Sequence, residues 1–301
     1  MKKFKFVAIA VAVFALAAFV LVGCSSGASS SSAASESAGS EEASASAESA
    51  SAESASAEGV VTDKLVVGFD AEYPPYGFLD ADGNPTGFDI DLAQAVAELE
   101  GWEFEAKPID WDSKDLELES GNINCIWNGF TIEGREDKYS FSKPYMLNEQ
   151  VIVVAADSDI ASFADLAGKK VITQAGSAAL GLLSEDGDQA ELGATFDGGA
   201  PQTIADYNNA FLQLESGAVD AVACDLSIAE YQMAQAEGKY KQLDEPLNSE
   251  HYGVGFKLGE AVIAQSVSDA MLELYENGTV EKLCEKYAEY GLSFDNWILT
   301  D

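Results

Sequence analysis

The chemistry available to this sequence centres on Arg135, the only arginine among its 301 residues. The chain carries 52 acidic residues against 16 basic ones, a net charge of −36. A guanidinium stays protonated, and its planar fork fits a carboxylate with two parallel hydrogen bonds. We therefore expect Arg135 to bind the carboxylate of a small ligand. The alternative is an ordinary ion pair, because Glu133, Glu136 and Asp137 are its neighbours in the sequence.

Asp225 is the candidate for the opposite charge. It follows a buried strand expected over residues 218–224 and precedes a helix expected over residues 226–237. A polar residue in that position either serves a ligand, because loops at the carboxyl ends of strands line the sites of open α/β sheets, or caps the following helix. Both roles are open for Asp225 at this point.

The first expected strand, residues 64–69, leads into an aromatic loop of the same kind. Asp70 in this loop suggests a ligand with a polar or cationic side chain, although a solvated loop carboxylate would give the same pattern. Tyr73 and Tyr76 either line a site or pack over the first strand. Trp127 likewise lines a pocket or covers the strand beneath it.

Residues 170–173 form a further expected strand, and residues 174–177 connect it to a helix expected over residues 178–183. A strand that runs through glycine and serine into a helix start presents free backbone amides, which suit an anion. The sequence contains neither Gly-x-x-x-x-Gly-Lys-Ser/Thr nor Gly-x-Gly-x-x-Gly. This connection is therefore an anion site other than a nucleotide phosphate loop.

Metal and covalent chemistry find little support in the composition. His251 is the only histidine and no Cys-x-x-Cys pattern occurs, which argues against a zinc site and against Ser-His or Cys-His catalysis. We expect no metal and no cofactor. Beyond Cys24 the cysteines are Cys125, Cys224 and Cys284, which allow one disulfide with a free thiol or three buried thiols.

The elements that must position these residues have an α/β pattern. Residues 87–99 give the clearest helix, with Asp89 as its expected N-terminal cap and Asp91 well placed against the helix dipole. Residues 80–85 form a turn cluster that closes a hairpin, and residues 102–106 alternate as a strand.

An internal repeat indicates how these elements are grouped. Residues 118–126 resemble residues 214–222, and each segment has a helix end, a glycine stop and a buried strand. Chance similarity of common turns is the alternative, but a repeated α/β unit favours two lobes over one sheet. The strands expected over residues 150–155 and 252–256 would join the halves and act as a hinge.

The first 59 residues differ from the rest. Residues 1–23 have the layout of a secretory signal, with Lys2, Lys3 and Lys5 before an apolar run of 16 residues, from Val7 to Val22. That run is shorter than the roughly 17–25 residues of a spanning helix. Leu-Val-Gly-Cys24 resembles the lipobox of bacterial lipoproteins, which implies cleavage before Cys24 and lipid, palmitate included, on that residue. Residues 24–59 beyond this cysteine hold only Ser, Ala, Glu and Gly, and read as a disordered tether.

Several motifs together resemble the bacterial extracellular solute-binding proteins of family 3, which bind polar amino acids for ABC importers. These motifs are Gly-Phe-Asp-Ile-Asp-Leu92, Phe-Ser-Lys-Pro-Tyr145 and Asn-Gly-Thr-Val-Glu-Lys-Leu283, and the resemblance covers residues 62–292. It implies a two-lobed α/β fold of the type II periplasmic-binding-protein kind. Residues 60–148 with 253–301 would form the first lobe, and residues 149–252 the second, with hinge strands at its ends.

The resemblance also implies roles for single residues. Arg135 would bind the α-carboxylate, Asp225 the α-ammonium, and Tyr73 and Trp111 would sandwich the ligand side chain. Gly129 and Thr131 would supply a carbonyl and a hydroxyl, while Ser177 and Ala178 would add contacts from a helix start. The full set expected to contact the ligand is Asp70, Tyr73, Trp111, Asn128, Gly129, Thr131, Arg135, Gln174, Ser177, Ala178 and Asp225.

The implied function is an amino-acid-binding component of an ABC importer, held by lipid on the extracytoplasmic face of the membrane. Its partners would be a free amino acid, cystine included, and the permease subunits, and the protein would be a monomer. The strongly acidic surface excludes nucleic acid as a partner. An enzyme that resembles cyclohexadienyl dehydratase is the alternative on the same fold, although no second acid/base pair is evident in the sequence.

Overall fold

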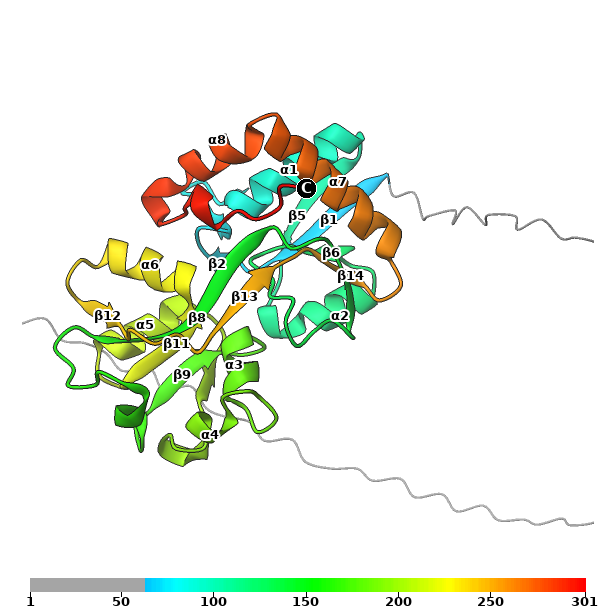
Figure 1. Cartoon of the computed structure of the whole chain (residues 1–301). Coiled ribbons are helices and arrows are strands. Elements are labelled where there is room, and N and C mark those ends of the chain that lie inside the picture. Colours follow the sequence, from blue (N-terminus) through cyan, green and yellow to red (C-terminus); the bar gives the residue numbers. More distant parts are fainter. Residues whose placement is uncertain (1–62) are drawn as a thin grey trace, which may run out of the picture. The chain divides into compact units, whose positions relative to one another are not determined.

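The computed structural model describes residues 63–301. The expected signal segment, the expected lipidation site at Cys24 and the expected tether all lie outside this range. The described residues form two α/β lobes, each built on its own sheet (Figure 1). No helix among residues 63–301 is long and apolar enough to cross a membrane.

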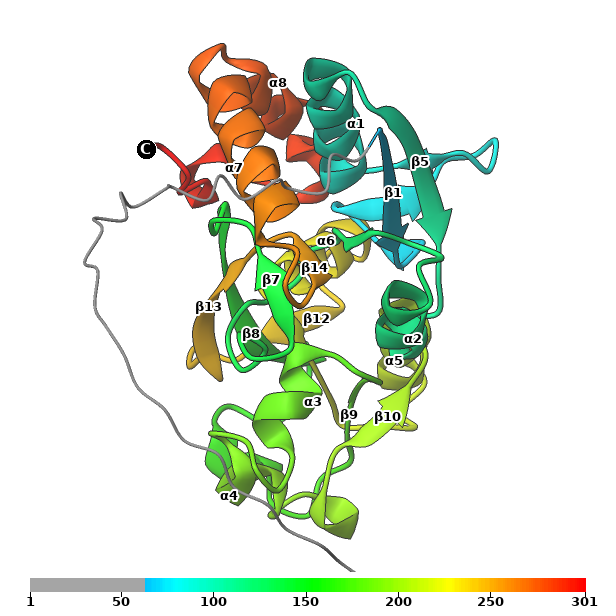
Figure 2. The same ribbon diagram turned by 90° about the vertical axis from the view of Figure 1, so that its right-hand side faces the viewer.

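The first sheet has the order β5-β1-β6-β14-β7. Strand β1 runs parallel to β5 and β6, whereas β14 is antiparallel to β6 and β7. Helices α1, α7 and α8 pack together along one face of this sheet and α2 lies on the other (Figure 2). The elements are β1 (Lys64–Phe69), α1 (Phe88–Glu100), β5 (Glu103–Pro108), α2 (Lys114–Glu119), β6 (Cys125–Ile126), β7 (Tyr139–Phe141), β14 (Gly255–Lys257), α7 (Ala261–Glu276) and α8 (Thr279–Lys286).

The second sheet has the order β10-β9-β11-β8-β12, and β13 also pairs with β8. Strand β9 runs parallel to β10 and β11, so their carboxyl ends lie at one edge, where ligands bind in open α/β sheets. Its elements are β8 (Met146–Ala155), β9 (Val171–Gln174), α3 (Ala178–Leu183), α4 (Ala190–Gly193), β10 (Gln202–Ile204), α5 (Tyr207–Glu215), β11 (Ala221–Asp225), α6 (Leu226–Gln235), β12 (Tyr240–Gln242) and β13 (Asn248–Tyr252).

A small third sheet, β2-β3-β4, extends from the first lobe. Strands β3 (Gly77–Leu79) and β4 (Pro85–Thr86) form the expected hairpin around residues 80–85, and β2 (Glu72–Tyr73) pairs with β3. Five 3-10 turns complete the described chain: Trp111–Ser113, Phe163–Leu166, Asp197–Gly199, Ala288–Tyr290 and Phe294–Asn296.

Two antiparallel strands connect the lobes. The chain passes from the first sheet to the second between β7 and β8, and returns between β13 and β14. Strands β8 and β13 lie side by side, with Asn148 opposite Glu250 and Met146 opposite Tyr252 (Figure 1). At their first-lobe ends these strands also form bridges to that lobe, Tyr252 to Thr131 and Met146 to Trp297.

The repeated segments fold alike. Gly121 and Gly217 end α2 and α5 with φ of 75° and 73°, a left-handed conformation that glycine adopts most readily. The amide of each donates to the carbonyl three residues earlier, Leu118 or Leu214, at 3.1 Å in both cases. The same turn thus delivers β6 into the first sheet and β11 into the second.

Asp89 does not cap α1, contrary to expectation. The helix begins after Gly87, whose φ of 131° and close approach to the carbonyl of Tyr76 leave no room for a Cβ. The Asp89 carboxyl is buried and accepts hydrogen bonds from the Gly129 amide at 2.6 Å and the Tyr145 hydroxyl at 2.8 Å. Asp89 therefore ties α1 to the segment that carries Arg135, and burial raises its pKa to about 7.

Two alternatives left open by the sequence are settled by packing. Trp127 is fully buried in the core with Val67 and Tyr145, so it covers the strand rather than lining a pocket. The three cysteines of the described chain are free and buried, so none forms a disulfide there. Burial raises the pKa of the Cys284 thiol to about 12.

Candidate functional site

A small cavity lies between the lobes, where β11 and the start of α3 face the segment 127–135. Its volume is about 10 Å³, room for about one water molecule. It brings together nine of the eleven residues expected to contact a ligand: Tyr73, Trp111, Gly129, Thr131, Arg135, Gln174, Ser177, Ala178 and Asp225. Asp70 and Asn128 lie beside the cavity rather than in its wall.

Arg135 is held by neutral groups. Its guanidinium donates to the carbonyl of Thr131 at 3.0 Å and to that of Gly176, across the cleft, at 3.3 Å. It also lies 4.8 Å from the ring centre of Phe130. Among residues 63–301 no carboxylate forms an ion pair with Arg135, and the neighbouring Glu133 contacts His251 instead. The ion-pair alternative is therefore wrong, and the guanidinium charge is left for another partner.

Asp225 does not cap the helix that follows it. Its side chain makes no capping bond, and its buried Oδ1 accepts from Asn148 at 2.9 Å, Gln150 at 2.6 Å and the Tyr252 hydroxyl at 2.9 Å. Burial, and then the negative charge of Glu250, raise its pKa to about 6. The capping role expected as one option is therefore wrong, and the carboxylate faces the cavity.

The helix start opposite Arg135 has the expected form. Ser177 caps α3 by accepting a hydrogen bond from the Leu180 amide at 3.1 Å, and its hydroxyl lies 3.2 Å from that of Thr173. Ala178 is the first residue of the helix. The amides at such a start have no partner within the helix and suit an anion.

Two aromatic side chains wall the cavity. Tyr73 and Trp111 are 6% and 8% exposed, and the Tyr73 hydroxyl lies 3.4 Å from that of Tyr252. Gly129 adopts a φ of 56°, and a Cβ there would come within 3.0 Å of the Tyr73 ring. The close approach of Gly129 to the aromatic wall therefore requires glycine.

Asp70 is a buried link between the lobes, not a solvated loop carboxylate. Its Oδ2 accepts from Gln174 in the second lobe at 2.5 Å, and its own amide donates to the Asn128 side chain at 2.6 Å. Burial raises the pKa of Asp70. Asp70 also borders a second cavity of about 890 Å³ whose other acidic residues include Glu72, Asp110, Asp112, Glu117 and Asp206.

Other direct contacts close the cleft around the cavity. Asn208 of the second lobe donates to Glu72 at 2.5 Å, and Lys114 of the first lobe donates to the Gly176 carbonyl at 3.1 Å. Gly176 thus accepts from both Arg135 and Lys114. The lobes are in contact on both sides of the site, so a ligand larger than water requires them to separate.

Lys114 is a functional candidate that the sequence did not reveal. It is 6% exposed, forms no ion pair among the described residues, and lies 5.1 Å from the ring centre of Trp111. Burial, and then the charge of Arg135, lower its pKa to about 8. The one available signal was its position three residues after Trp111, which places both on the turn that begins α2.

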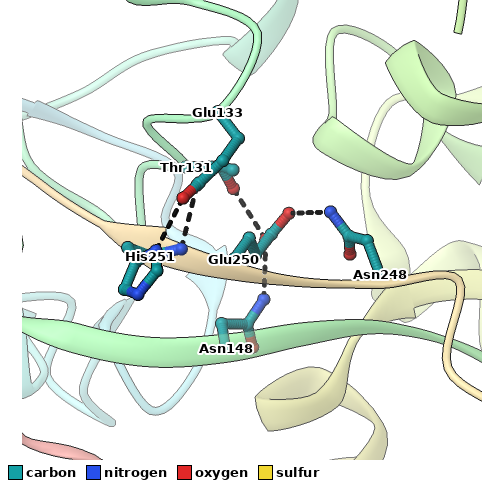
Figure 3. Close-up of polar contacts among 6 residues, drawn as sticks. All are labelled: Thr131, Glu133, Asn148, Asn248, Glu250 and His251. Carbon is teal, nitrogen blue, oxygen red and sulfur yellow. Dashed lines mark hydrogen bonds and ion pairs between the residues drawn. The ribbon is translucent and has the colours of Figure 1, made fainter. Parts of the chain in front are cut away.

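Glu250 is the second candidate that the sequence reasoning missed. It is completely buried on β13 beside Thr131, whose hydroxyl donates to it at 2.8 Å (Figure 3). Alternation along β13 was a usable signal, because Glu250 and Tyr252 share the buried face of the strand. The described residues contain no cluster of side chains suited to a metal ion.

Several known proteins resemble this chain in sequence and in fold. Residues 65–290 match the model of the bacterial extracellular solute-binding proteins, family 3. The L-cystine-binding protein TcyJ of Escherichia coli is 30% identical over 226 residues, covering 74% of this chain and 82% of that protein. A substrate-binding protein of an ABC uptake transporter from Streptococcus pneumoniae, solved with bound histidine, is 32% identical with a TM-score of 0.71 and covers 77% of this chain and 95% of its own.

A second similar structure bears on the enzyme alternative. It is an ancestral amino acid-binding protein described as a precursor of cyclohexadienyl dehydratase, with 32% identity, a TM-score of 0.65, and coverage of 75% of this chain and 95% of its own. That structure is itself named as a binding protein, like the other relatives. The two-lobed fold expected from the sequence is confirmed by these neighbours.

Proposed function

The chain belongs to the bacterial extracellular solute-binding proteins of family 3, and on that premise we propose that it binds a free polar amino acid, cystine included, between its lobes. It would deliver this ligand to the membrane permease of an ABC importer. One observation supports this ligand class above the others. The single arginine and the buried Asp225 line the same small cavity, and neither charge is neutralised by an ion pair among the described residues.

A zwitterion satisfies both charges at once. Its carboxylate would bind the Arg135 fork and the amides at the start of α3, and its ammonium would bind Asp225. The ammonium would meet Oδ2 of Asp225, since the bonds from Asn148, Gln150 and Tyr252 all end on Oδ1. A buried charge is costly without a partner, so each end of the ligand removes a cost that the protein alone would carry.

The two charges also explain closure. Arg135 belongs to the segment before the first crossing, whereas Asp225 ends a strand of the second sheet. A ligand that touches both binds the closed form more tightly than the open one, and that difference in affinity drives the lobes together. The lobe limits that we assign, 60–148 with 253–301 and 149–252, imply that a few residues near 148 and 253 absorb the motion.

Side-chain selectivity would be decided beyond Tyr73 and Trp111. We call the pair Arg135 and Asp225 the clamp. Asp70 and Gln174 lie between this clamp and the acidic cavity of about 890 Å³. We expect the ligand side chain to enter from the clamp toward Asp70, where a polar or cationic group would replace the bond from Gln174. Asn128 would act indirectly, because its side chain holds the amide of Asp70.

The N-terminal segment would anchor the protein. Cleavage of residues 1–23 and lipidation of Cys24 would leave a monomer tethered to the extracytoplasmic face by residues 24–59. Metabolic labelling with palmitate tests this: we expect label on the unmodified chain and none on Cys24→Ser. Label that persists in Cys24→Ser would contradict the assignment.

A thermal-shift panel of the common amino acids and cystine tests the function. The fragment 60–301 suits it, because both sheets and their cores lie within this range. At about 100 times the dissociation constant a ligand stabilises the fold by roughly 2.7 kcal/mol, a readily visible melting shift. No shift with any amino acid would reject the proposal. Prephenate and arogenate serve as controls, and we expect no turnover of either.

A further inference from the structure

Glu250 has the geometry of a positioning residue, and the role that its contacts imply extends the proposed function. We propose that Glu250 makes the ammonium end of the clamp selective for a charged donor, by fixing the Thr131 hydroxyl as an acceptor and by placing a second negative charge beside Asp225. The inference rests on the proposed binding of an amino acid. The site would discriminate an ammonium from a neutral or absent group at the same carbon.

The surroundings of Glu250 consist of donors. Its Oε1 accepts from the Thr131 hydroxyl and from the side-chain amides of Asn148 and Gln150, each at 2.8 Å. Its Oε2 accepts from Asn248 at 3.1 Å (Figure 3). Four donors and no acceptor face a fully buried carboxyl, which suits the carboxylate form because that form only accepts.

Thr131 gains a fixed direction from this contact. A hydroxyl has one proton to donate and two lone pairs to accept with. Because the proton of Thr131 goes to Glu250, its oxygen can only accept from the cavity that it lines. An ammonium donates three protons and accepts none, so Thr131 matches an ammonium and does not match a carboxylate.

Glu250 and Asp225 share their donors. The Asn148 amide donates to both carboxylates, at 2.9 Å to Asp225 and 2.8 Å to Glu250. The Gln150 amide does the same at 2.6 and 2.8 Å, and its own oxygen has no partner among the described residues. Two carboxylates on one pair of neutral amides, with no cation between them, attract a positive ligand group more strongly than one would.

Few other titratable or charged groups in the described part of the chain lie near the carboxyls of Asp225 and Glu250. Tyr252 donates to Asp225 from the same strand as Glu250, the Tyr73 hydroxyl lies beside Tyr252, and Arg135 lines the same cavity. The raised pKa of Asp225, about 6, reflects burial and then Glu250. Protonation of Asp225 removes the charge that an ammonium requires, so binding weakens as the pH falls through that value.

Calorimetric titration of Glu250→Gln tests the inference, with Glu149→Gln on the neighbouring strand as the matched control. The probe is the amino acid that gives the largest melting shift in the panel. A glutamine places N–H groups where Thr131, the two amides or Asn248 already donate, so we expect affinity at pH 7 to fall on the order of 10-fold. We also expect the pH at which binding weakens to be lower in Glu250→Gln than in the control. Equal affinity and an equal pH midpoint in the two variants would overturn the proposal.

A second measurement needs no ligand. The carbon-13 shift of the Asp225 side-chain carboxyl, assigned by its loss in Asp225→Asn, reports protonation in the ligand-free protein. We expect a midpoint near pH 6 in the unmodified fragment and a lower one in Glu250→Gln. Equal midpoints would reject the proposed effect of Glu250 on Asp225, even if the thermal-shift panel identifies an amino acid ligand. Different midpoints together with no melting shift for any amino acid would reject the proposed ligand class but support the effect of Glu250 on Asp225. If Glu250→Gln does not fold, Thr131→Val provides the alternative test, because it removes the hydroxyl that Glu250 orients. Unchanged amino acid affinity in Thr131→Val would overturn the proposed role of Glu250.

Discussion

The cationic and the anionic ends of the clamp are built in the same way with opposite signs. Arg135 and Lys114 donate only to backbone carbonyls, while Asp225 and Glu250 accept only from neutral amides and hydroxyls. No ion pair among residues 63–301 joins the two ends. A protein that solvates each charge with neutral groups holds both in place without cancelling either, and leaves the opposite charge to the ligand.

The two ends of the clamp differ in whether their contacts require the lobes to meet. The partners of Asp225 lie on the crossing strands β8 and β13, so the anionic end is assembled whether or not the lobes meet. At the cationic end, Arg135 and Lys114 reach across to Gly176, and those contacts exist only when the lobes meet. We infer that ligand binds first at the anionic end and that the cationic end completes the closed form.

Removal of the anionic charge should have the largest effect. Asp225→Asn leaves a ligand ammonium without its counter-ion, and loss of one partner of a buried charged pair costs 2–5 kcal/mol. We therefore expect amino acid affinity to fall on the order of 100-fold or more by calorimetry, and its pH dependence between 5 and 7 to disappear. Asp244→Asn, on an exposed loop, is the matched control. Retained affinity in Asp225→Asn would place the ammonium elsewhere.

Loss of the fork at the cationic end should come next. Arg135→Lys keeps the charge but not the bidentate geometry, so we expect affinity to fall at least about 10-fold. The melting temperature of the ligand-free protein should change little, because Arg135 makes no ion pair there. Unchanged binding in this variant would mean that the carboxylate is held by another group.

Lys114 distinguishes closure from direct contact. Lys114→Gln removes one of the two cations on Gly176, and we expect affinity to fall roughly 5-fold, as for the net loss of one ordinary hydrogen bond. Stopped-flow measurements should show the loss mainly in the dissociation rate, because the contact forms after the lobes meet. Lys138→Gln, exposed and nearby, is the control. A loss confined to the association rate would contradict the proposed order of events.

A change in pH should affect the anionic end and leave the cationic end charged. The folded-state pKa values of Asp89 and Asp225, about 7 and about 6, lie above the ordinary value of 3.8, so the folded protein binds protons more tightly between pH 4 and 7. Acidification from pH 7 to 5 should therefore raise the free energy of unfolding of the ligand-free protein, by roughly 3 kcal/mol for the two groups together. Urea unfolding at both pH values measures this. A ligand-free protein that loses stability on that change would show that these pKa values are not raised.

The sequence predicted the fold and most of the cavity wall because those features rest on local patterns. The turns at Gly121 and Gly217, the helix start at Ser177 and the isolated arginine are all visible within a few residues. The predicted capping role of Asp89 was wrong. Its position in the sequence suited a cap, whereas the partners that bury it, Gly129 and Tyr145, lie 40 and 56 residues away.

The residues that the sequence did not reveal depend on the same kind of distant contact. Glu250 meets Thr131 across 119 positions, and Lys114 meets Gly176 across 62. Alternation along β13 and the spacing from Trp111 were the only local signals for these two positions. Neither signal identifies the distant partner, since a glutamate in a strand and a lysine in a helix turn are ordinary surface residues by type. Only the packing of the crossing strands and the contact of the lobes make them part of the site.

The most direct test of the clamp removes each charge from the ligand instead of from the protein. Calorimetry on the fragment 60–301 would compare the amino acid with the largest melting shift against its decarboxylated amine and its des-amino acid. Two uncompensated ends predict that both analogues bind at least about 100-fold more weakly than the amino acid. An analogue that lacks either charge and still binds as tightly as the amino acid would contradict the account.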